Sequence, residues 1–410
     1  MTEPKTAPEA LAEWAAKTPE RTFLTQPFEG DVREWTFRQA HDDAARFASA
    51  LLKLGLAPGD KVAILSKNCA EWMIADVAIS MAGLVSVPIY PTAGADMIGY
   101  VLEHSEARAV VVGRLDDPGP ARRALSPEVA TIGLRYPCVD CQHDWQTMID
   151  GSEPVGQLHR PASGEVMTIL YTSGSTGKPK GVVISYDAYE YASTVGAETM
   201  GISAADRALS YLPLAHITER TVIAGPAFYC GYPLFFVDKL DTFLTDLLRC
   251  EPTLFISVPR LWVQFQIGVH KKMPPQKLER LLKLPLIGKR VARKVRQGLG
   301  LGSCRLVGSG SAPISPLTLR WYEKIGVDIS EGWGMSETTG LACTNMPFRS
   351  ECIGTIGVPL PGTEMKLSDA GEVLIRSPGL FTEYYKQPGL TAEVFTADGF
   401  FHTGDKADWN

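Results

Sequence analysis

The most informative stretch of this 410-residue chain is Tyr171-Thr-Ser-Gly-Ser-Thr-Gly-Lys-Pro-Lys-Gly181. Its eleven residues include three glycines, four hydroxyl side chains and two lysines, and strand-like apolar runs precede and follow it. Glycines let a backbone approach an anion closely. Backbone N–H groups, hydroxyls and lysines bind and neutralise phosphate oxygens. The stretch therefore predicts a phosphate-binding loop between two strands, with an ordinary flexible surface loop as the alternative.

The spacing of this loop excludes one common class of phosphate site. A Walker A loop requires Gly-x4-Gly-Lys followed by Ser or Thr. Here Thr172 stands five residues before Gly177, and Pro179 follows Lys178. We therefore expect phosphate binding without the P-loop NTPase fold.

Helix and strand patterns alternate on the amino-terminal side of the loop. Thr36 and Gln39 form a capping-box pattern before an apolar stripe of helical spacing, which Gly55 ends. The next apolar runs predict strands at 62–65, 85–90 and 109–112, and helices at 70–82 and 97–104. Strands separated by helices are typical of parallel βαβ units.

The rest of the chain divides into three kinds of sequence. Residues 114–163 are polar and contain Pro and Gly, which predicts a connection or an irregular insertion. A second α/β stretch begins near Val166, with strands expected at 167–171, 208–212, 231–237, 254–258 and 305–308. From about Gly357, short runs alternate with Gly-containing turns, which is typical of β structure.

The predicted fold class is therefore α/β. We expect two αβ subdomains with mainly parallel sheets, at residues 1–163 and 164–356. A small β-rich subdomain with the form of a distorted barrel is expected at residues 357–410.

Composition excludes several classes of protein. Hydrophobic residues make up 45% of the chain and charged residues 21%, which is ordinary globular usage. The net charge of −6 argues against general nucleic-acid binding. No run approaches 18 apolar residues, and the first residues lack the pattern of a secretory signal. Eight scattered cysteines do not suggest a disulfide framework, so we expect a cytoplasmic protein.

One cluster of cysteines requires a separate check. Cys138, Cys141 and His143 lie close together in sequence, as zinc ligands often do. No second Cys/His pair lies nearby, so the local sequence does not supply four ligands. We expect no metal at this position.

The charge distribution is uneven. Residues 271–296 contain ten Lys or Arg and one acidic residue, which gives this segment a charge of +9 and leaves −15 on the rest of the chain. Such a patch would suit peripheral contact with an anionic membrane or with phosphate. The alternative is a solvated helical face.

Downstream motifs fit one family in the family's own order. They are Tyr211-Leu-Pro-Leu-Ala-His216, Gly308-Ser-Gly-Ser-Ala-Pro313, Glu331-Gly-Trp-Gly-Met-Ser-Glu337-Thr338, Gly371-Glu-Val-Leu-Ile-Arg-Ser-Pro-Gly379 and Thr403-Gly-Asp405. Together with the glycine-rich loop, they resemble the signatures of the acyl-adenylate-forming, AMP-binding superfamily. Trp333 and Ser336 stand where Tyr and Thr are commoner in that family. The resemblance covers essentially the whole chain.

The resemblance implies a reaction and its cofactors. A substrate carboxylate would attack the α-phosphorus of ATP with release of pyrophosphate, and coenzyme A would then accept the acyl group. Charge on the triphosphate would be neutralised by the loop and by Mg²⁺, for which Glu337 and Thr176 are the expected ligands. The expected catalytic residues are Lys180, His216, Glu337 and Thr176. The expected nucleotide-binding residues are Thr172, Ser173, Gly174, Ser175, Thr176, Gly177, Lys178, Gly310, Ser311, Ala312, Pro313, Glu331, Gly332, Trp333, Gly334, Met335, Ser336 and Asp405.

Three of these residues have specific expected roles. Trp333 lies between two glycines, where an aromatic face can stack on a purine. The carboxylate of Asp405 can accept hydrogen bonds from both ribose hydroxyls. His216 would orient the acyl carboxylate or close the empty acyl tunnel. No proton-transfer role is expected for it, because the attacking carboxylate is already ionised.

The segment Leu212-Pro-Leu-Ala-His-Ile-Thr-Glu-Arg220 looks most like long-chain fatty acyl-CoA synthetases. Trp262 matches the position of their gating aromatic residue, although core packing is the alternative for this side chain. Each buried methylene of an acyl chain contributes about 0.8 kcal/mol, so a deep tunnel would select for chain length. The expected substrate-binding residues are His216, Trp262, Gly308, Ser309 and Gly310.

Members of this superfamily carry a further C-terminal domain with a lysine that contacts the reacting groups. No residue of this chain matches that lysine, so we expect that domain to be absent and the chain to bind substrates but turn over poorly. Two alternatives remain open. One is an adenylating enzyme that acts on a short or aryl acid or transfers to a carrier-protein thiol. The other is a non-catalytic nucleotide- or acyl-binding protein. The oligomeric state is not predicted.

Overall fold

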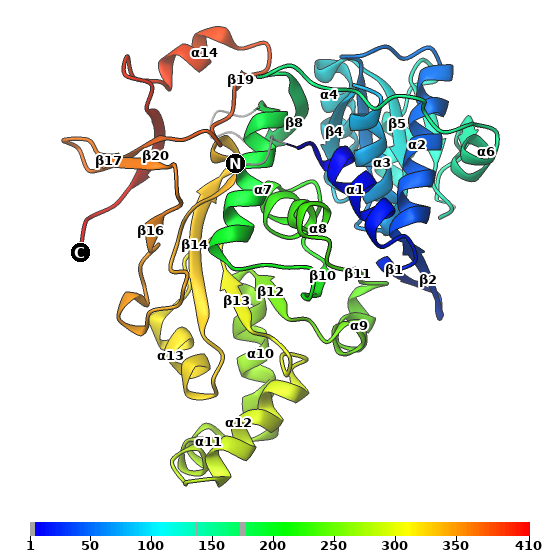
Figure 1. The fold of residues 1–410 in the computed structure, drawn as a ribbon. Helices are drawn as coiled ribbons and strands as arrows, with labels where there is room; N and C mark the ends of the chain where they lie inside the picture. Colours follow the sequence, from blue (N-terminus) through cyan, green and yellow to red (C-terminus); the bar gives the residue numbers. More distant parts are fainter. Residues whose placement is uncertain (1–4, 137, 173–177) are drawn as a thin grey trace.

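The computed structural model describes residues 5–136, 138–172 and 178–410. In these residues it contains two large, mainly parallel sheets, a small antiparallel sheet, and helices that cover the large sheets (Figure 1). The predicted α/β fold class is confirmed.

The first large sheet has eight strands in the order β19-β9-β8-β4-β3-β5-β6-β7. Pairing is parallel from β8 to β7, whereas β9 and β19 pair antiparallel at one edge. The strands are β3 (Lys61–Leu65), β4 (Val85–Ile89), β5 (Ala107–Val112), β6 (Ala130–Gly133), β7 (His143–Asp144), β8 (Val166–Thr172), β9 (Lys180–Ser185) and β19 (Glu383–Tyr384).

The second large sheet has nine strands in the order β16-β15-β14-β13-β12-β10-β11-β1-β2. Pairing is parallel from β14 to β1 and antiparallel at both ends. The strands are β1 (Thr22–Phe28), β2 (Asp31–Thr36), β10 (Ala208–Ser210), β11 (Leu234–Phe236), β12 (Leu254–Ser257), β13 (Leu306–Ser309), β14 (Ile329–Met335), β15 (Gly340–Thr344) and β16 (Val358–Pro359).

The small sheet lies within residues 357–410. It pairs β17 (Glu364–Leu367), β18 (Glu372–Arg376) and β20 (Phe401–Lys406) antiparallel, with β18 in the middle. The helix α14 (Pro388–Glu393) lies between β19 and β20 in the chain. In the described residues β17 and β20 are the two edges of this sheet, so it is open and does not form the expected barrel.

Sheet membership does not follow chain order. The hairpin of β1 and β2 joins the nine-stranded sheet, whereas β8 and β9 join the eight-stranded one. The predicted boundary at residue 163 therefore does not separate the two large sheets. The expectation of an irregular 114–163 segment was wrong, because this segment forms α5 (Gly119–Ala124), β6, β7 and α6 (Trp145–Asp150), and its two strands extend the eight-stranded sheet.

Residue alternation along β3 shows how the eight-stranded sheet is covered. Val62 and Ile64 pack into one core cluster, and Ala63 and Leu65 pack into another on the opposite face. This is the period-two pattern of a strand buried on both faces, as parallel strands usually are. The first face is covered by α2 (Phe37–Lys53) and α3 (Ala70–Met81), and the second by α4 (Ala95–Ser105) and α5.

The helix α3 occupies the centre of the molecule. All twelve of its residues are buried, and its cluster contains residues of both large sheets. The far face of the nine-stranded sheet packs against α9 (Phe243–Cys250), α10 (Pro259–Lys272), α12 (Ile287–Gly298) and α13 (Pro316–Lys324). The remaining α-helices are α1 (Ala7–Lys17), α7 (Tyr186–Thr199), α8 (Gly225–Cys230) and α11 (Pro275–Leu282). No helix in the described residues is long and apolar enough to cross a membrane.

A π-helix, η1 (Glu219–Ala224), carries a buried arginine that contacts both α3 and β8. Arg220 is only 1% exposed. Its guanidinium donates to both carboxylate oxygens of Asp76, each at 2.7 Å, and to the hydroxyl of Thr168 at 2.8 Å. Asp76 is on α3 and Thr168 is on β8, so Arg220 anchors η1 to the half of the molecule that carries the predicted phosphate loop.

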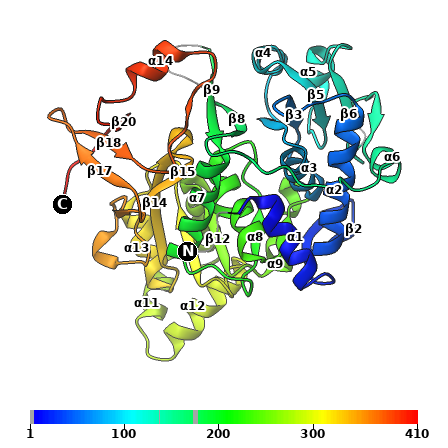
Figure 2. The same cartoon turned by 45° about the horizontal axis from the view of Figure 1, so that its top comes forward.

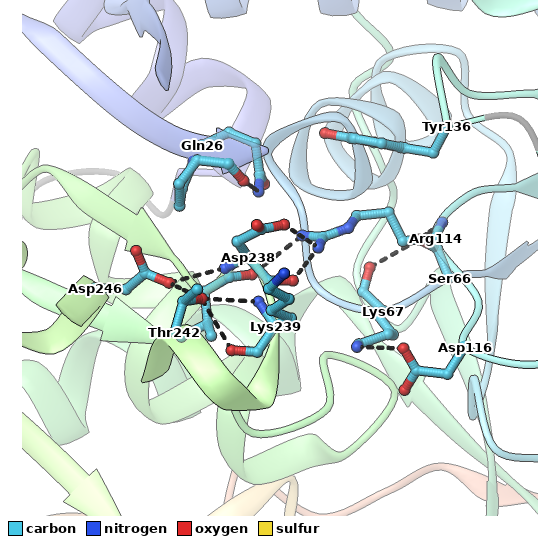
Figure 3. A network of polar contacts seen from close by, with 12 residues as sticks. Gln26, Ser66, Lys67, Arg114, Asp116, Tyr136, Asp238, Lys239, Thr242 and Asp246 are labelled. Atoms are coloured by element: carbon cyan, nitrogen blue, oxygen red, sulfur yellow. Dashed lines mark hydrogen bonds and ion pairs between the residues drawn. The ribbon is translucent and has the colours of Figure 1, made fainter. Parts of the chain in front are cut away.

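A second arginine connects the ends of the two large sheets (Figure 3). Arg114, just after β5, donates to the backbone oxygen of Val237 at 3.0 Å and to the carboxylate of Asp238 at 2.9 Å. The backbone N–H of Asp238 in turn donates to Asp246 on α9 at 3.1 Å. The guanidinium also lies over the ring of Tyr136, 5.4 Å from its centroid.

The neighbour of Arg220 in η1 is a buried acid. Glu219 has no solvent exposure, and in the described residues neither carboxylate oxygen has a hydrogen-bond partner. Burial raises the pKa of Glu219 to about 8, an effect that the nearby Ser210 hydroxyl and the backbone of Tyr211 only partly offset. The folded protein therefore favours the protonated, neutral form of this side chain.

We expect Asp76→Asn to lower the free energy of unfolding by about 3–5 kcal/mol, because it leaves the buried guanidinium of Arg220 without its countercharge. Urea denaturation measures this change. The matched control is Glu364→Gln, which breaks the exposed pair between Glu364 and Arg376 and should cost less than about 1 kcal/mol. Equal effects of the two substitutions would contradict the assigned importance of the buried pair.

We expect Glu219→Gln to reduce the loss of stability at alkaline pH. The pKa of Glu219 is raised from its ordinary value of 4.5 to about 8 in the folded chain. Stability from its protonated form is therefore complete below pH 4.5 and is lost as the pH rises through 8. Relative to wild type, the variant should gain about 2 kcal/mol or more between pH 5 and pH 9. Denaturation curves at both pH values measure this gain, and parallel pH profiles would contradict it.

Candidate functional site

The predicted phosphate loop connects two antiparallel neighbours. Thr172, at the end of β8, is paired with Lys180, at the start of β9. Lys178 is exposed, and its Nζ lies 5.9 Å from the ring centroid of Tyr100. Ser173, Gly174, Ser175, Thr176 and Gly177 lie outside the described residues. The described residues thus place both ends of the loop and both of its lysines.

Lys180 and Glu337 are brought together by a residue that the sequence analysis did not identify. The ring of Tyr384 lies under the ammonium group of Lys180, which is 4.9 Å from the ring centroid. The hydroxyl of Tyr384 donates to Oε1 of Glu337 at 2.9 Å. Burial and the carboxylate of Glu337 both raise the pKa of this phenol, so it remains a proton donor.

Glu337 itself is held at both its backbone and its side chain. It lies in the short 3₁₀ segment η3 (Ser336–Thr338) after β14, together with Ser336, and it is buried. Its backbone oxygen accepts a hydrogen bond from the N–H of Phe381 at 2.8 Å. In the described residues no hydrogen bond involves Oε2 of Glu337, which leaves this oxygen for a cation.

The predicted base-stacking residue and the predicted ribose ligand are in direct contact. The indole N–H of Trp333 donates to Oδ2 of Asp405 at 2.9 Å. Trp333 is on β14 of the nine-stranded sheet, and Asp405 is on β20 of the small sheet. These two side chains, 72 residues apart in the chain, therefore meet at the junction of the two sheets.

The hairpin of β14 and β15 explains the glycines around Trp333. A Cβ on Gly334 would lie 1.7 Å from the backbone oxygen of Gly340, so only glycine fits this crossing. On β14, Gly332 directly precedes Trp333, and Met335 directly follows Gly334. At the start of the motif, Glu331 accepts a hydrogen bond from the N–H of Gly354 at 2.7 Å, and burial raises the pKa of its carboxyl.

The second predicted nucleotide segment follows β13. Gly310 lies beside β14, because its Cβ position would be 3.2 Å from the backbone oxygen of Gly332. Ser311 has a positive φ of 65° and turns the chain. Ala312 and Pro313 are exposed beyond this turn. The segment thus runs past the carboxyl ends of parallel strands, the edge at which open α/β sheets bind ligands.

A small cavity of about 40 Å³ lies next to this segment. Its walls include three predicted substrate residues, Gly308, Ser309 and Gly310, and also Trp333. The lining residues that were not predicted are mostly apolar or small: Met200, Thr218, Val222, Ile256, Ser330, Gly340, Leu341, Thr344 and Met346. The cavity therefore adjoins the Trp333–Asp405 pair and offers apolar walls.

His216 is near this cavity but is not among its lining residues. Its Nδ1 accepts a hydrogen bond from the backbone N–H of Thr218 at 3.2 Å, and Thr218 does line the cavity. Burial lowers the pKa of His216, so the imidazole remains neutral at pH 7. The ring is thus fixed in orientation just before η1.

Trp262 is not at the cavity wall. It is 0% exposed and packs edge-on against Phe255 and Tyr322 in the core behind the nine-stranded sheet. The structure therefore assigns Trp262 to core packing and does not bring it to the cavity with Gly308, Ser309 and Gly310.

The residues fit a magnesium ion that is shared with a phosphate ligand. In the described residues no group of three or more His, Cys, Asp or Glu side chains is arranged to hold a metal by itself. Mg²⁺ commonly binds one or two carboxylates together with substrate phosphates and water. Glu337, with Oε2 free of hydrogen bonds and Lys180 beside the same tyrosine, provides such a partial site.

Comparison with known sequences finds one matching family and several related ligases. Residues 11–385 match the AMP-binding enzyme family. The chain is 31% identical to the long-chain-fatty-acid–CoA ligase FadD15 of Mycobacterium tuberculosis, over 94% of this chain and 69% of that protein. It is also 31% identical to fatty acyl-CoA synthetase A of Dictyostelium discoideum, over 95% of this chain and 65% of that protein. The chain thus spans about two thirds of the length of these curated relatives.

Solved structures share the fold. The N-terminal domain of FACL13 from Mycobacterium tuberculosis superposes with a TM-score of 0.78 at 22% identity, covering 98% of this chain and 97% of that one. An o-succinylbenzoate CoA synthetase from Bacillus subtilis, in complex with its acyl-adenylate intermediate, gives a TM-score of 0.76 at 22% identity, covering 98% and 75%. ATP, Mg²⁺ and coenzyme A are the cofactors of AMP-binding acyl-CoA ligases. On the family match and the identity to the curated ligases, this chain belongs to the AMP-binding enzyme family.

Proposed function

We propose that the protein activates a long-chain fatty acid with ATP, forming an acyl-adenylate that then acylates coenzyme A. The observation that carries this proposal is the contact series from Lys180 through Tyr384 to Glu337. It joins the end of the predicted phosphate loop to the predicted magnesium ligand. Transfer of an adenylyl group requires such a concentration of charge-neutralising groups.

The long-chain substrate rests on two independent supports. The curated relatives named above are long-chain or fatty acyl-CoA ligases, although each matches this chain over only part of its length. The cavity walls of Val222, Ile256 and Leu341 are apolar, as an acyl chain requires. A short or aryl acid is the alternative substrate, because related folds include the o-succinylbenzoate synthetase.

Different residues of the chain would bind different parts of the substrates. Trp333 would stack on the adenine, and Asp405 would accept hydrogen bonds from the ribose. Lys180 and the loop from Thr172 to Lys178 would bind phosphate oxygens. Mg²⁺, held by Glu337 and Thr176, would neutralise charge on the triphosphate. His216, neutral and fixed by Thr218, would orient the acyl carboxylate without moving a proton.

We also place the protein in the cytoplasm. Each of its eight cysteines, all of which lie in described residues, is an unpaired thiol. Unpaired cysteines are typical of a reducing compartment.

We expect affinity for non-hydrolysable acyl-adenylate mimics to rise steeply from four through ten to sixteen carbons. Twelve additional methylenes supply at most about 10 kcal/mol, much of it offset by ordering of the chain, so a gain of about 100-fold or more is expected. Calorimetric titration measures it without requiring turnover, with AMP as the chain-free reference. Affinity that stays flat or falls beyond four carbons would assign the site to a short or aryl acid.

The same titration with the variant Ile256→Phe tests whether the cavity holds the acyl chain. The larger side chain narrows the cavity and should weaken binding of the sixteen-carbon mimic by about tenfold while leaving AMP binding unchanged. The control is Val263→Phe, an equal or larger increase in size at a partly exposed position on α10 outside the cavity. If both variants behave alike, the described cavity does not hold the acyl chain.

We expect Glu337→Gln to remove the effect of Mg²⁺ on ATP binding. In the wild type, Mg²⁺ should strengthen ATP binding by about tenfold over a chelator-treated sample, as one good ion contact would. In the variant, the two affinities should agree within about twofold. Glu383→Gln is the control, because Glu383 is exposed and lies next to Tyr384. A variant that retains the full effect of Mg²⁺ would exclude Glu337 as the metal ligand.

A further inference from the structure

The basic segment of the sequence forms a helical hairpin that extends from the body of the molecule. It consists of the end of α10, then α11 and α12, and we call residues 271–298 the basic hairpin. In both Figures 1 and 2 its two helices, α11 and α12, lie at one extremity, away from the eight-stranded sheet and from α14. It belongs neither to the cavity nor to the cluster around Glu337.

Most cations of the basic hairpin are exposed and have no ion-pair partner among the described residues. Nine of its ten basic residues are exposed, and the tenth, Arg296, donates to the backbone oxygen of Ile325. The single acid, Glu279, pairs with Lys324 outside the hairpin at 2.9 Å. Within the described chain no acidic side chain lies within ion-pair distance of the nine exposed cations, Lys271, Lys272, Lys277, Arg280, Lys283, Lys289, Arg290, Arg293 and Lys294.

The charges of α12 lie on one face. Lys289, Arg290, Arg293 and Lys294 follow the spacing i, i+1, i+4, i+5, which is one side of an α-helix. The opposite side carries Ala292, which is buried against the protein. The helix is thus attached to the body by one face and presents a continuous positive face outward.

The turn between α11 and α12 presents apolar side chains. Leu284, Leu286 and Ile287 are 45%, 76% and 47% exposed. They are consecutive in the chain apart from Pro285, and Lys283 and Lys289 flank them. Three exposed aliphatic side chains at a protruding tip, bordered by cations, are unusual on a surface that faces only water.

The backbone at this tip is strained. Leu286 has φ 62° and ψ −47°, and the N–H of Ile287 donates to the backbone oxygen of Pro285 at 2.6 Å. This is a γ-turn of the rare, left-handed kind, which is unfavourable for a residue with a side chain as large as leucine. Glycine would adopt this conformation with less strain, yet the chain has its most exposed tip leucine here.

We propose that the basic hairpin is a docking surface for an anionic lipid bilayer, with Leu284, Leu286 and Ile287 inserted among the acyl chains and the nine cations facing the headgroups. Interfacial helices combine an apolar edge with Lys and Arg in this way. The surface of an anionic leaflet attracts such a patch electrostatically. The −15 carried by the rest of the chain orients the molecule with this hairpin toward the bilayer.

A lipid surface fits better than a nucleic acid. Residues 275–300 contain no aromatic side chain that could stack on a base. A nucleic-acid site also has no use for three exposed aliphatic side chains. The proposal is independent of the proposed catalytic function, because it concerns a surface outside the site.

Co-sedimentation of the chain with vesicles tests the proposal without any substrate. The protein should bind vesicles of phosphatidylcholine with 30% phosphatidylglycerol, and should do so at least tenfold more weakly with phosphatidylcholine alone. Binding should fall as salt rises from 50 to 500 mM, because the charges are screened. Equal binding to both kinds of vesicle, or to neither, would overturn the proposal. A short DNA duplex that binds more tightly than the anionic vesicles would also overturn it.

Two variants separate the parts of the surface. Lys289→Gln with Arg293→Gln should weaken binding to anionic vesicles at least fivefold. The matched control is Arg123→Gln with Arg160→Gln, an equal change of charge at exposed positions of the amino-terminal half, and it should alter binding less than twofold. Similar losses in both double variants would mean that total charge, and not the basic hairpin, drives binding.

The tip is tested by Leu286→Gly, which removes the apolar side chain and relaxes the turn. The variant should keep or raise the thermal midpoint while binding anionic vesicles at least threefold more weakly. Because the fold is not destabilised, weaker binding cannot be ascribed to unfolding. Unchanged binding by this variant would overturn insertion of the tip.

Discussion

The buried ion pair between Arg220 and Asp76 constrains the arrangement of the whole molecule. A charge removed from water is tolerated only when a partner of opposite charge is well placed, so this pair forms in only one packing of η1 against α3. The same guanidinium also bonds to Thr168 on β8, four residues before the predicted phosphate loop begins at Thr172. Arg220 is the second residue of η1, which begins three residues after His216. One side chain thus fixes His216 relative to the end of β8 from which the expected phosphate loop begins.

The candidate site depends on this packing because its contacts join different sheets. Lys180 belongs to the eight-stranded sheet, whereas Glu337 follows β14 of the nine-stranded one. Tyr384 connects them from the short edge strand β19. Asp405 reaches Trp333 from the small sheet. A shift of one sheet against another by an ångström or two would break each of these contacts while leaving every strand intact.

Most of the fold could be predicted from the sequence, because apolar periodicity and turn residues act locally. The capping box at Thr36 is formed and begins α2, and the strands around Val62 and Val85 lie where the pattern indicated. The hairpin of β1 and β2 was missed, since its two-residue turn is Glu29-Gly30, both with positive φ, and lacks the usual Asn or Asp. Its assignment to the nine-stranded sheet depends on pairing with β11, more than 200 residues later. Such pairing leaves no local signal.

Local sequence patterns also do not show where a single apolar or aromatic side chain ends up in the fold. Trp262 and Tyr384 are both large aromatic side chains, yet Trp262 is sealed in the core and Tyr384 contacts both Lys180 and Glu337. Tyr384 lies only five residues beyond Gly379, where the recognised motif ends, and only the pairing of β19 with β9 gives it its position. Leu286 differs from both, because in the described structure it is 76% exposed and also has a strained backbone. This side chain therefore adds little to the stability of its own fold, and nothing in the sequence alone indicated its strained turn.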